Sequence, residues 1–398
     1  MISFARANLI GKGCDQLAMA KPHYDARIDF FRGLALIFIF INHIPENGFS
    51  YFTSRQVALF DSAEVFMFLG GYSAALAYGS LASGDLQPLA QKALRRALTI
   101  LCYHLGLLAI VLAASYVLSV GYSISTGYEI FIEKVQAEPL SVLLAAPLLA
   151  FQAPLLDILP IYIAVMLAAP FMIWLLARSP IALLAVSGVI WMFAARFFPL
   201  VPTVTFDIYW GFNPFCWQFL FVIGLVCGWY GRAGGLPIAS AEGRSVLDML
   251  GLAVVLFSGV VLFFVTFHDI EIFGAGTLRG FYWSLNKQCL DLWRIVGLIA
   301  SAYVIARLIS KQEPLLLTRT ATWVRAAGAH SLPVFSLGVV LSFTGKFVTR
   351  AFESSLAVDF VVTAVGTTIL LGAGVLLREI NADRVVLALP TVGDSRAA

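Results

Sequence analysis

An arginine and a histidine, Arg32 and His43, lie eleven positions apart in an apolar segment near the start of the chain. Eleven residues complete almost three turns of an α-helix, so both side chains lie on one helix face, about 16 Å apart along the axis. An arginine can hold an anion, and a histidine can take up a proton. The spacing therefore predicts an anion contact and a base at opposite ends of one helix. Singly, Arg32 can also be a snorkelling interface anchor, and His43 a capped residue beside the Pro45 turn.

Carboxylates accompany this pair. Asp29 belongs to the same segment, while Asp61 and Glu64 begin the next apolar segment three positions apart, on one helix face. One of these two acids can orient the imidazole and stabilise its protonated form, as the acid of a catalytic triad does. Asp61 is equally well explained as an acid at a helix N-terminus. We therefore expect His43, Glu64 and Asp61 to form a catalytic group.

Two arginines, Arg95 and Arg96, open a third apolar segment. A cytoplasmic membrane anchor accounts for at least one of them. The functional alternative is a clamp on the phosphates of a nucleotide-bearing donor. His104 follows about two turns later, either as a ligand of substrate or donor or as a partner in a hydrogen bond between helices.

Further polar residues stand at the ends of later apolar segments, where they predict a polar cavity inside a bundle. Ionisable groups at membrane depth are costly and are candidate functional residues by default. With Arg32, Asp29, Arg95, Arg96 and His104, we expect the substrate-binding residues to include Asp157, Asn213, Trp217, Gln218, Lys287, Arg294 and His330.

The composition is that of a membrane protein. Of the 398 residues, 60% are hydrophobic and 12% are charged, whereas a soluble domain carries roughly 25% charged residues. Most of the exterior must therefore face lipid. The formal net charge is only +3, and without a basic run the sequence predicts no nucleic-acid partner. The five cysteines form no CxxC pair, so we expect no disulfide framework and no metal site.

The apolar segments predict an all-α, polytopic bundle of about ten spanning helices, each about 20 residues long. Lys and Arg are concentrated at one set of helix ends, which predicts that both termini are cytoplasmic. We divide the chain into a cytoplasmic leader (1–24), a transmembrane domain (25–380) and a cytoplasmic tail (381–398). The expected spans are 28–45, 57–80, 95–120, 155–177, 180–198, 213–231, 246–267, 290–309, 330–350 and 357–377.

One of the two largest outer loops covers about 121–154. Within it, Tyr128–Val135 is either an amphipathic segment on the membrane surface or a capping loop. The stretch 141–153 is apolar but short and is flanked by prolines, which favours a re-entrant or interfacial piece over a span.

Several short blocks run in order over nearly the whole chain: Ile28–Ala35, Asn42–Pro45, Phe60–Phe66, Phe66–Tyr72, Tyr103–His104, Asp157–Tyr162, Phe212–Gln218 and Ser331–Phe335. Together with the Arg32–His43 spacing, this set resembles the membrane-bound acyltransferase-3 group. It is most similar to the OpgC succinyltransferase-type proteins, which modify osmoregulated periplasmic glucans. One departure is Gly70-Gly71, where the group often has Ser-Gly.

The resemblance implies an O-acyltransferase of the bacterial inner membrane, with His43 as catalytic base and Arg32 on the donor side. The partners it implies are cytoplasmic acyl-CoA, with succinyl-CoA as the expected donor substrate, and a periplasmic glucan or other glycan as acceptor. No permanently bound cofactor is expected. Direct transfer and a relay through an acylated His43 both fit these residues.

Two other classes of function fit an apolar bundle with a polar interior. One is a multi-pass transporter, and the other is a non-catalytic subunit of a glycan-export system. The halves of the chain show no internal repeat, which disfavours the transporter. The sequence does not decide the acyl group, the glycan or the oligomeric state.

Overall fold

The computed structural model describes residues 25–81, 85–205, 208–232, 241–267, 274–311, 313–352 and 355–387. Within these ranges the regular elements are helices, accompanied by one isolated β-bridge between Pro202 and Tyr209. The all-α prediction is confirmed for this part of the chain. The predicted leader, 1–24, and residues 388–398 of the predicted tail lie outside the described residues.

Seven helices of the described part are long and apolar enough to cross a membrane. Their length and composition agree with the predicted polytopic bundle. They are α5 (Leu86–Tyr116, continued by a π-helical turn, Val117–Gly121), α8 (Ile158–Arg178), α9 (Pro180–Phe197), α10 (Pro214–Arg232), α11 (Ala241–Thr266), α15 (Ser331–Ala351) and α16 (Leu356–Leu387).

The other three predicted spans are also helices: α2 (Ala26–Asn42), α4 (Ser62–Tyr78) and α13 (Leu292–Leu308). Each has 17 residues, or about 25 Å, which is shorter than the roughly 30 Å of bilayer hydrocarbon. Among the described residues, seven helices therefore meet the length requirement, and the predicted count of about ten is reached only if these three shorter helices also cross the membrane.

Shorter elements fill the connections. The predicted amphipathic segment is helix α6 (Glu129–Ala137), and the short apolar stretch after it forms only the two turns of α7 (Pro139–Ala145). The remaining short elements are α3 (Ser54–Val57), α12 (Ala275–Ser284), α14 (Arg319–Ala329) and the 3-10 turns Gly48–Phe52, Gly79–Leu81 and Pro314–Leu317.

Glycines bring α4 and α10 into close contact. A side chain on Gly71 would collide with the backbone of Phe221, and one on Gly224 would collide with the backbone of Phe68. Small residues allow such backbone approach inside a membrane. Gly70 faces the Tyr162 hydroxyl in the same way, so the serine that the resembling group often carries there would collide with this tyrosine.

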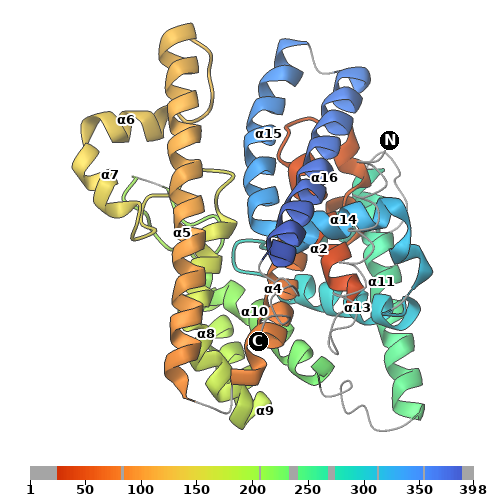
Figure 1. The fold of residues 1–398 in the computed structure, drawn as a ribbon. Helices are drawn as coiled ribbons and strands as arrows, with labels where there is room; N and C mark the ends of the chain where they lie inside the picture. Colours follow the sequence, from red (N-terminus) through yellow and green to blue (C-terminus); the bar gives the residue numbers. More distant parts are fainter. Residues whose placement is uncertain are drawn as a thin grey trace, which may run out of the picture.

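Helix α2 lies among four neighbours that fix its direction. It is antiparallel to α4, because Arg32 contacts Leu69 near the middle of that helix while Asn42 contacts Asp61 just before it begins. It is parallel to α15, because the Ser342 hydroxyl donates to the Phe40 carbonyl (3.1 Å) and, further along both segments, Gly345 faces Ile44 just after α2. α14 and α16 cover the remaining sides. Figure 1 shows α15 and α16 side by side, and the long α5 with α8 beside its lower half.

Candidate functional site

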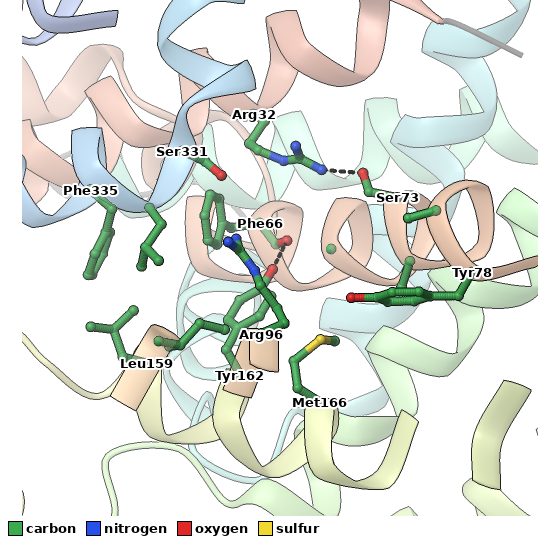
Figure 2. Close-up of a pocket in the computed structure, with 15 residues that line it drawn as sticks. Arg32, Phe66, Ser73, Tyr78, Arg96, Leu159, Tyr162, Met166, Ser331 and Phe335 are labelled. Atoms are coloured by element: carbon green, nitrogen blue, oxygen red, sulfur yellow. Dashed lines mark hydrogen bonds between the residues drawn. The ribbon is translucent and has the colours of Figure 1, made fainter. Parts of the chain in front are cut away.

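A cavity of about 180 Å³ lies where α2, α4, α5, α8 and α15 meet. Two guanidinium groups, those of Arg32 and Arg96, come to it from different helices (Figure 2). The rest of its lining is mostly apolar or aromatic, with the hydroxyl groups of Ser73, Tyr162 and Ser331 among it. Two cations beside a small, largely apolar space form a site for the anionic part of a ligand.

Arg32 is held in place by α4. Its Nη2 atom donates to the Leu69 carbonyl (3.2 Å) and to the Ser73 hydroxyl. Its Nη1 atom lies 3.8 Å from the Asp29 carboxylate one turn earlier on α2. Asp29 therefore belongs to the surroundings of Arg32 and is absent from the cavity lining. Sequence reasoning missed Ser73 because its hydroxyl sits in a run of small residues.

Arg95 and Arg96 have different environments although they are neighbours in the chain. Arg96 lines the cavity, and Arg95 does not. Both are exposed, and successive residues of a helix point about 100° apart. Of the two arginines predicted to contact phosphate, only Arg96 is therefore at the cavity, and Arg95 lies on a different side of α5.

Three aromatic residues line the cavity, and one of them, Phe66, lies on α4 between the level of Arg32 and that of His43. Phe66 stacks on Phe335 (ring centroids 6.4 Å apart) and meets Tyr162 edge-on (5.4 Å). The Tyr162 hydroxyl donates to the Phe66 carbonyl (Figure 2). We call Phe66, Tyr162 and Phe335 the aromatic cluster. His43 is absent from the cavity lining, so the two ends of α2 do not share this cavity.

His43 directly follows the last residue of α2 and is exposed. Its backbone N–H still donates to the Ile39 carbonyl (3.1 Å), so the helical register from Arg32 is preserved. Its ring Nδ1 lies 2.6 Å from the same carbonyl. A carbonyl can only accept, so we assign the proton to Nδ1, which leaves the Nε2 lone pair free to take a proton.

Asp61 stands beside this end of α2. Its carboxylate accepts from Asn42 (3.4 Å) and from the Lys287 ammonium group (2.7 Å), and it caps α4. Burial alone would raise the pKa of Asp61, but Lys287, the Ser62 N–H and the charge of Arg294 together outweigh it and lower that pKa to about 2. The carboxylate is therefore ionised at neutral pH. Among the described residues it makes no hydrogen bond to His43.

Glu64 is not brought to His43. One carboxylate oxygen accepts from the Arg294 guanidinium (Nε, 2.6 Å), and the other accepts from the Asp61 backbone N–H (3.1 Å). Glu64 is fully buried and Arg294 nearly so. The Glu64–Arg294 pair joins α4 to α13. The sequence predicts that the Glu64 carboxylate orients the His43 imidazole, but both of its oxygens are bound elsewhere.

The predicted residues of α10 serve the packing of the bundle. Asn213 caps the helix through the N–H groups of Phe215 (2.9 Å) and Cys216 (3.3 Å), and Gln218 bonds to Ser187. The buried Trp217 indole donates to the carbonyls of residues 287 (3.2 Å) and 288 (3.1 Å). Trp217 therefore holds the backbone segment whose lysine side chain reaches Asp61.

Asp157 precedes α8 and is half-buried. Burial raises the pKa of Asp157 to about 6, although the charge of Lys287 opposes this shift. The charge of Lys287 thus acts on the pKa of both Asp61 and Asp157, but its ion pair is with Asp61.

The two remaining histidines differ in their surroundings. His104 is fully buried, and neither ring nitrogen has a hydrogen-bond partner among the described residues. Of the two alternatives that the sequence leaves for His104, the hydrogen bond to another helix is therefore not formed among the described residues. His330, by contrast, bonds to the Ala326 carbonyl (3.0 Å) and to Asn381 (2.9 Å). It does not line the cavity, although its neighbour Ser331 does.

A family model described as OpgC protein matches residues 24–382. No curated protein and no solved structure matches the chain.

The Glu64–Arg294 pair gives a stability prediction. Arg294→Ala leaves a buried carboxylate unpaired, so we expect a loss of about 3–5 kcal/mol in the free energy of unfolding. The double variant Glu64→Leu/Arg294→Met removes both charges and should recover most of that loss. The check is the melting temperature of the protein purified in detergent. A wild-type melting temperature for Arg294→Ala would contradict the role given to this pair.

Proposed function

Because the chain belongs to the OpgC family, we propose that it is an integral membrane O-acyltransferase acting on a periplasmic glucan. Family membership implies glucan succinyltransferase activity, and the donor is then cytoplasmic succinyl-CoA. The observation that carries the proposal is the arrangement of α2, with Arg32 at a cationic cavity and His43 presenting a free Nε2 at the other end.

The proposal includes the membrane topology. With α2, α4 and α13 crossing as well, ten spans alternate in direction and both termini are cytoplasmic. The antiparallel pairing of α2 with α4 and the parallel pairing of α2 with α15 support this order. Spans of about 25 Å are accommodated by local thinning of the bilayer, at modest cost. The Arg32 end then faces the cytoplasm, and the His43 end faces the periplasm.

At the cytoplasmic end, Arg32 and Arg96 bind the phosphates of the acyl-CoA donor. Guanidinium groups form strong charge-assisted hydrogen bonds with phosphate oxygens. The pantetheine arm then extends toward His43 through the aromatic cluster, which must move aside because it stands between the two levels. His104 is buried on α5, one turn beyond the cavity residue Ile100, and it donates a hydrogen bond to the pantetheine arm or to the acyl group.

At the periplasmic end, His43 Nε2 takes the proton of a glucan hydroxyl as its oxygen attacks the thioester carbonyl. The carbon–sulfur bond breaks, and the CoA thiolate leaves and takes the proton from the His43 imidazolium. Asp61, ionised and next to Asn42, stabilises the imidazolium that forms in between. Lys287 fixes Asp61 in position, and Glu64 acts only through its pair with Arg294.

Replacement of the base tests this function directly. His43→Ala should reduce succinylation of periplasmic glucans by about 10²-fold or more, as measured by mass spectrometry of glucans from a strain that lacks the native gene. His330→Ala is the matched control, because His330 lies away from the cavity, and it should leave the glucans fully modified. Full succinylation with His43→Ala protein present in the membrane would refute His43 as the base.

The donor end gives a separate prediction. Arg96→Ala should raise the KM for succinyl-CoA about tenfold or more, because one charge-assisted hydrogen bond to phosphate is lost. Arg95→Ala removes the neighbouring charge outside the cavity and should change KM little. The measurement is CoA release by purified protein with added glucan. Equal effects of the two variants would mean that general positive charge, and not the cavity, holds the donor.

A further inference from the structure

Two cysteines far apart in sequence, Cys216 and Cys289, lie next to each other beside the Lys287 segment. Cys216 is in the first turn of α10, and Cys289 is in the connection between α12 and α13. Both side chains are buried. The two thiol groups lie close enough to affect each other's ionisation.

The backbone around the two cysteines sets this proximity. The Gln288 carbonyl accepts from the Asn213 N–H (2.9 Å) and from the Trp217 indole (3.1 Å), so the residue before Cys289 is bound to both ends of the first turn of α10. The Pro199 carbonyl contacts the Cys289 sulfur (3.4 Å) and the Asn213 amide (3.4 Å). Hydrogen bonds to the backbone therefore hold the two cysteine-bearing segments next to each other, whatever rotamers the cysteine side chains adopt.

Although the sequence, without a CxxC pair, predicts no disulfide framework, we propose that Cys216 and Cys289 form a disulfide in the protein. This proposal rests on the proposed topology, which puts both residues at the periplasmic side, where disulfides form and persist. The two thiols lose two protons and two electrons as the sulfur–sulfur bond forms. The electrons pass by thiol–disulfide exchange to the disulfide of a periplasmic oxidoreductase, which becomes a dithiol.

The bond would act on the acceptor end of the site. Lys287 precedes Cys289 by two residues, and its Nζ atom holds the Asp61 carboxylate beside α2. A covalent link to α10 supplements the hydrogen bonds from Trp217 and fixes the segment that carries Lys287. The disulfide is thus a positioning element for Asp61, and it does not contact the reacting atoms.

Mass spectrometry of thiol-blocked protein tests the bond. Membranes are quenched in acid, denatured and treated with N-ethylmaleimide, and the protein is purified and digested without reduction. We expect a linked peptide pair containing Cys216 and Cys289, two hydrogens lighter than the sum of the thiol peptides. Cys102 and Cys227 should carry the label. Labelling of Cys216 and Cys289 before reduction would overturn the proposal.

A second measurement separates the bond from simple packing. Reduction should lower the melting temperature of the wild-type protein by on the order of 5 °C. It should not change that of Cys216→Ser/Cys289→Ser, and Cys227→Ser on the same helix should respond as the wild type does. Neither readout needs activity, so a linked peptide in a protein that fails to modify glucans would count against the enzyme alone. Intact succinylation with free thiols would count against the disulfide alone.

Discussion

Two ion pairs at the start of α4 hold together the end of the bundle that carries His43. Asp61 is bound by Lys287, and directly beneath it the buried Glu64 is bound by Arg294. An unpaired charge in the buried Glu64–Arg294 pair would be strongly destabilising, so Glu64 requires its cation. The pairs join α4 to the segment before α13 and to α13 itself. Because Asn42 also bonds to Asp61, the end of α2 is positioned by the same network.

This arrangement separates two tasks along one helix. At the Arg32 end, a small cavity with two guanidinium groups offers a site for an anionic donor. At the other end, the imidazole of His43 is oriented by a carbonyl of its own helix and needs no carboxylate to fix its tautomer. Phe66 of the aromatic cluster lies between these ends along α4, and His43 does not line the cavity at the Arg32 end. In the proposed transfer, this cluster moves when the donor is bound.

The sequence predicted local features well. Apolar segments became helices at each expected place, and the eleven-residue spacing of Arg32 and His43 survives because α2 keeps its hydrogen bonding through residue 43. Pairing between distant segments was not predictable. Nothing near Glu64 in the chain indicates that Arg294 will be its partner, and the difference between Arg95 and Arg96 depends on the rotation of α5. The roles of Asn213 and Gln218 were likewise not predictable. The Asn213 side chain caps α10, and the Gln218 side chain joins α10 to α9.

In the proposed mechanism, donor and acceptor act from opposite sides of the membrane along α2. This mechanism is tested most directly with inside-out membrane vesicles loaded with glucan, to which succinyl-CoA is added outside. We expect the enclosed glucan to be succinylated while CoA is released outside, and we expect no modification of glucan added only to the outer solution. Succinylation only when glucan and succinyl-CoA share one side would contradict the account.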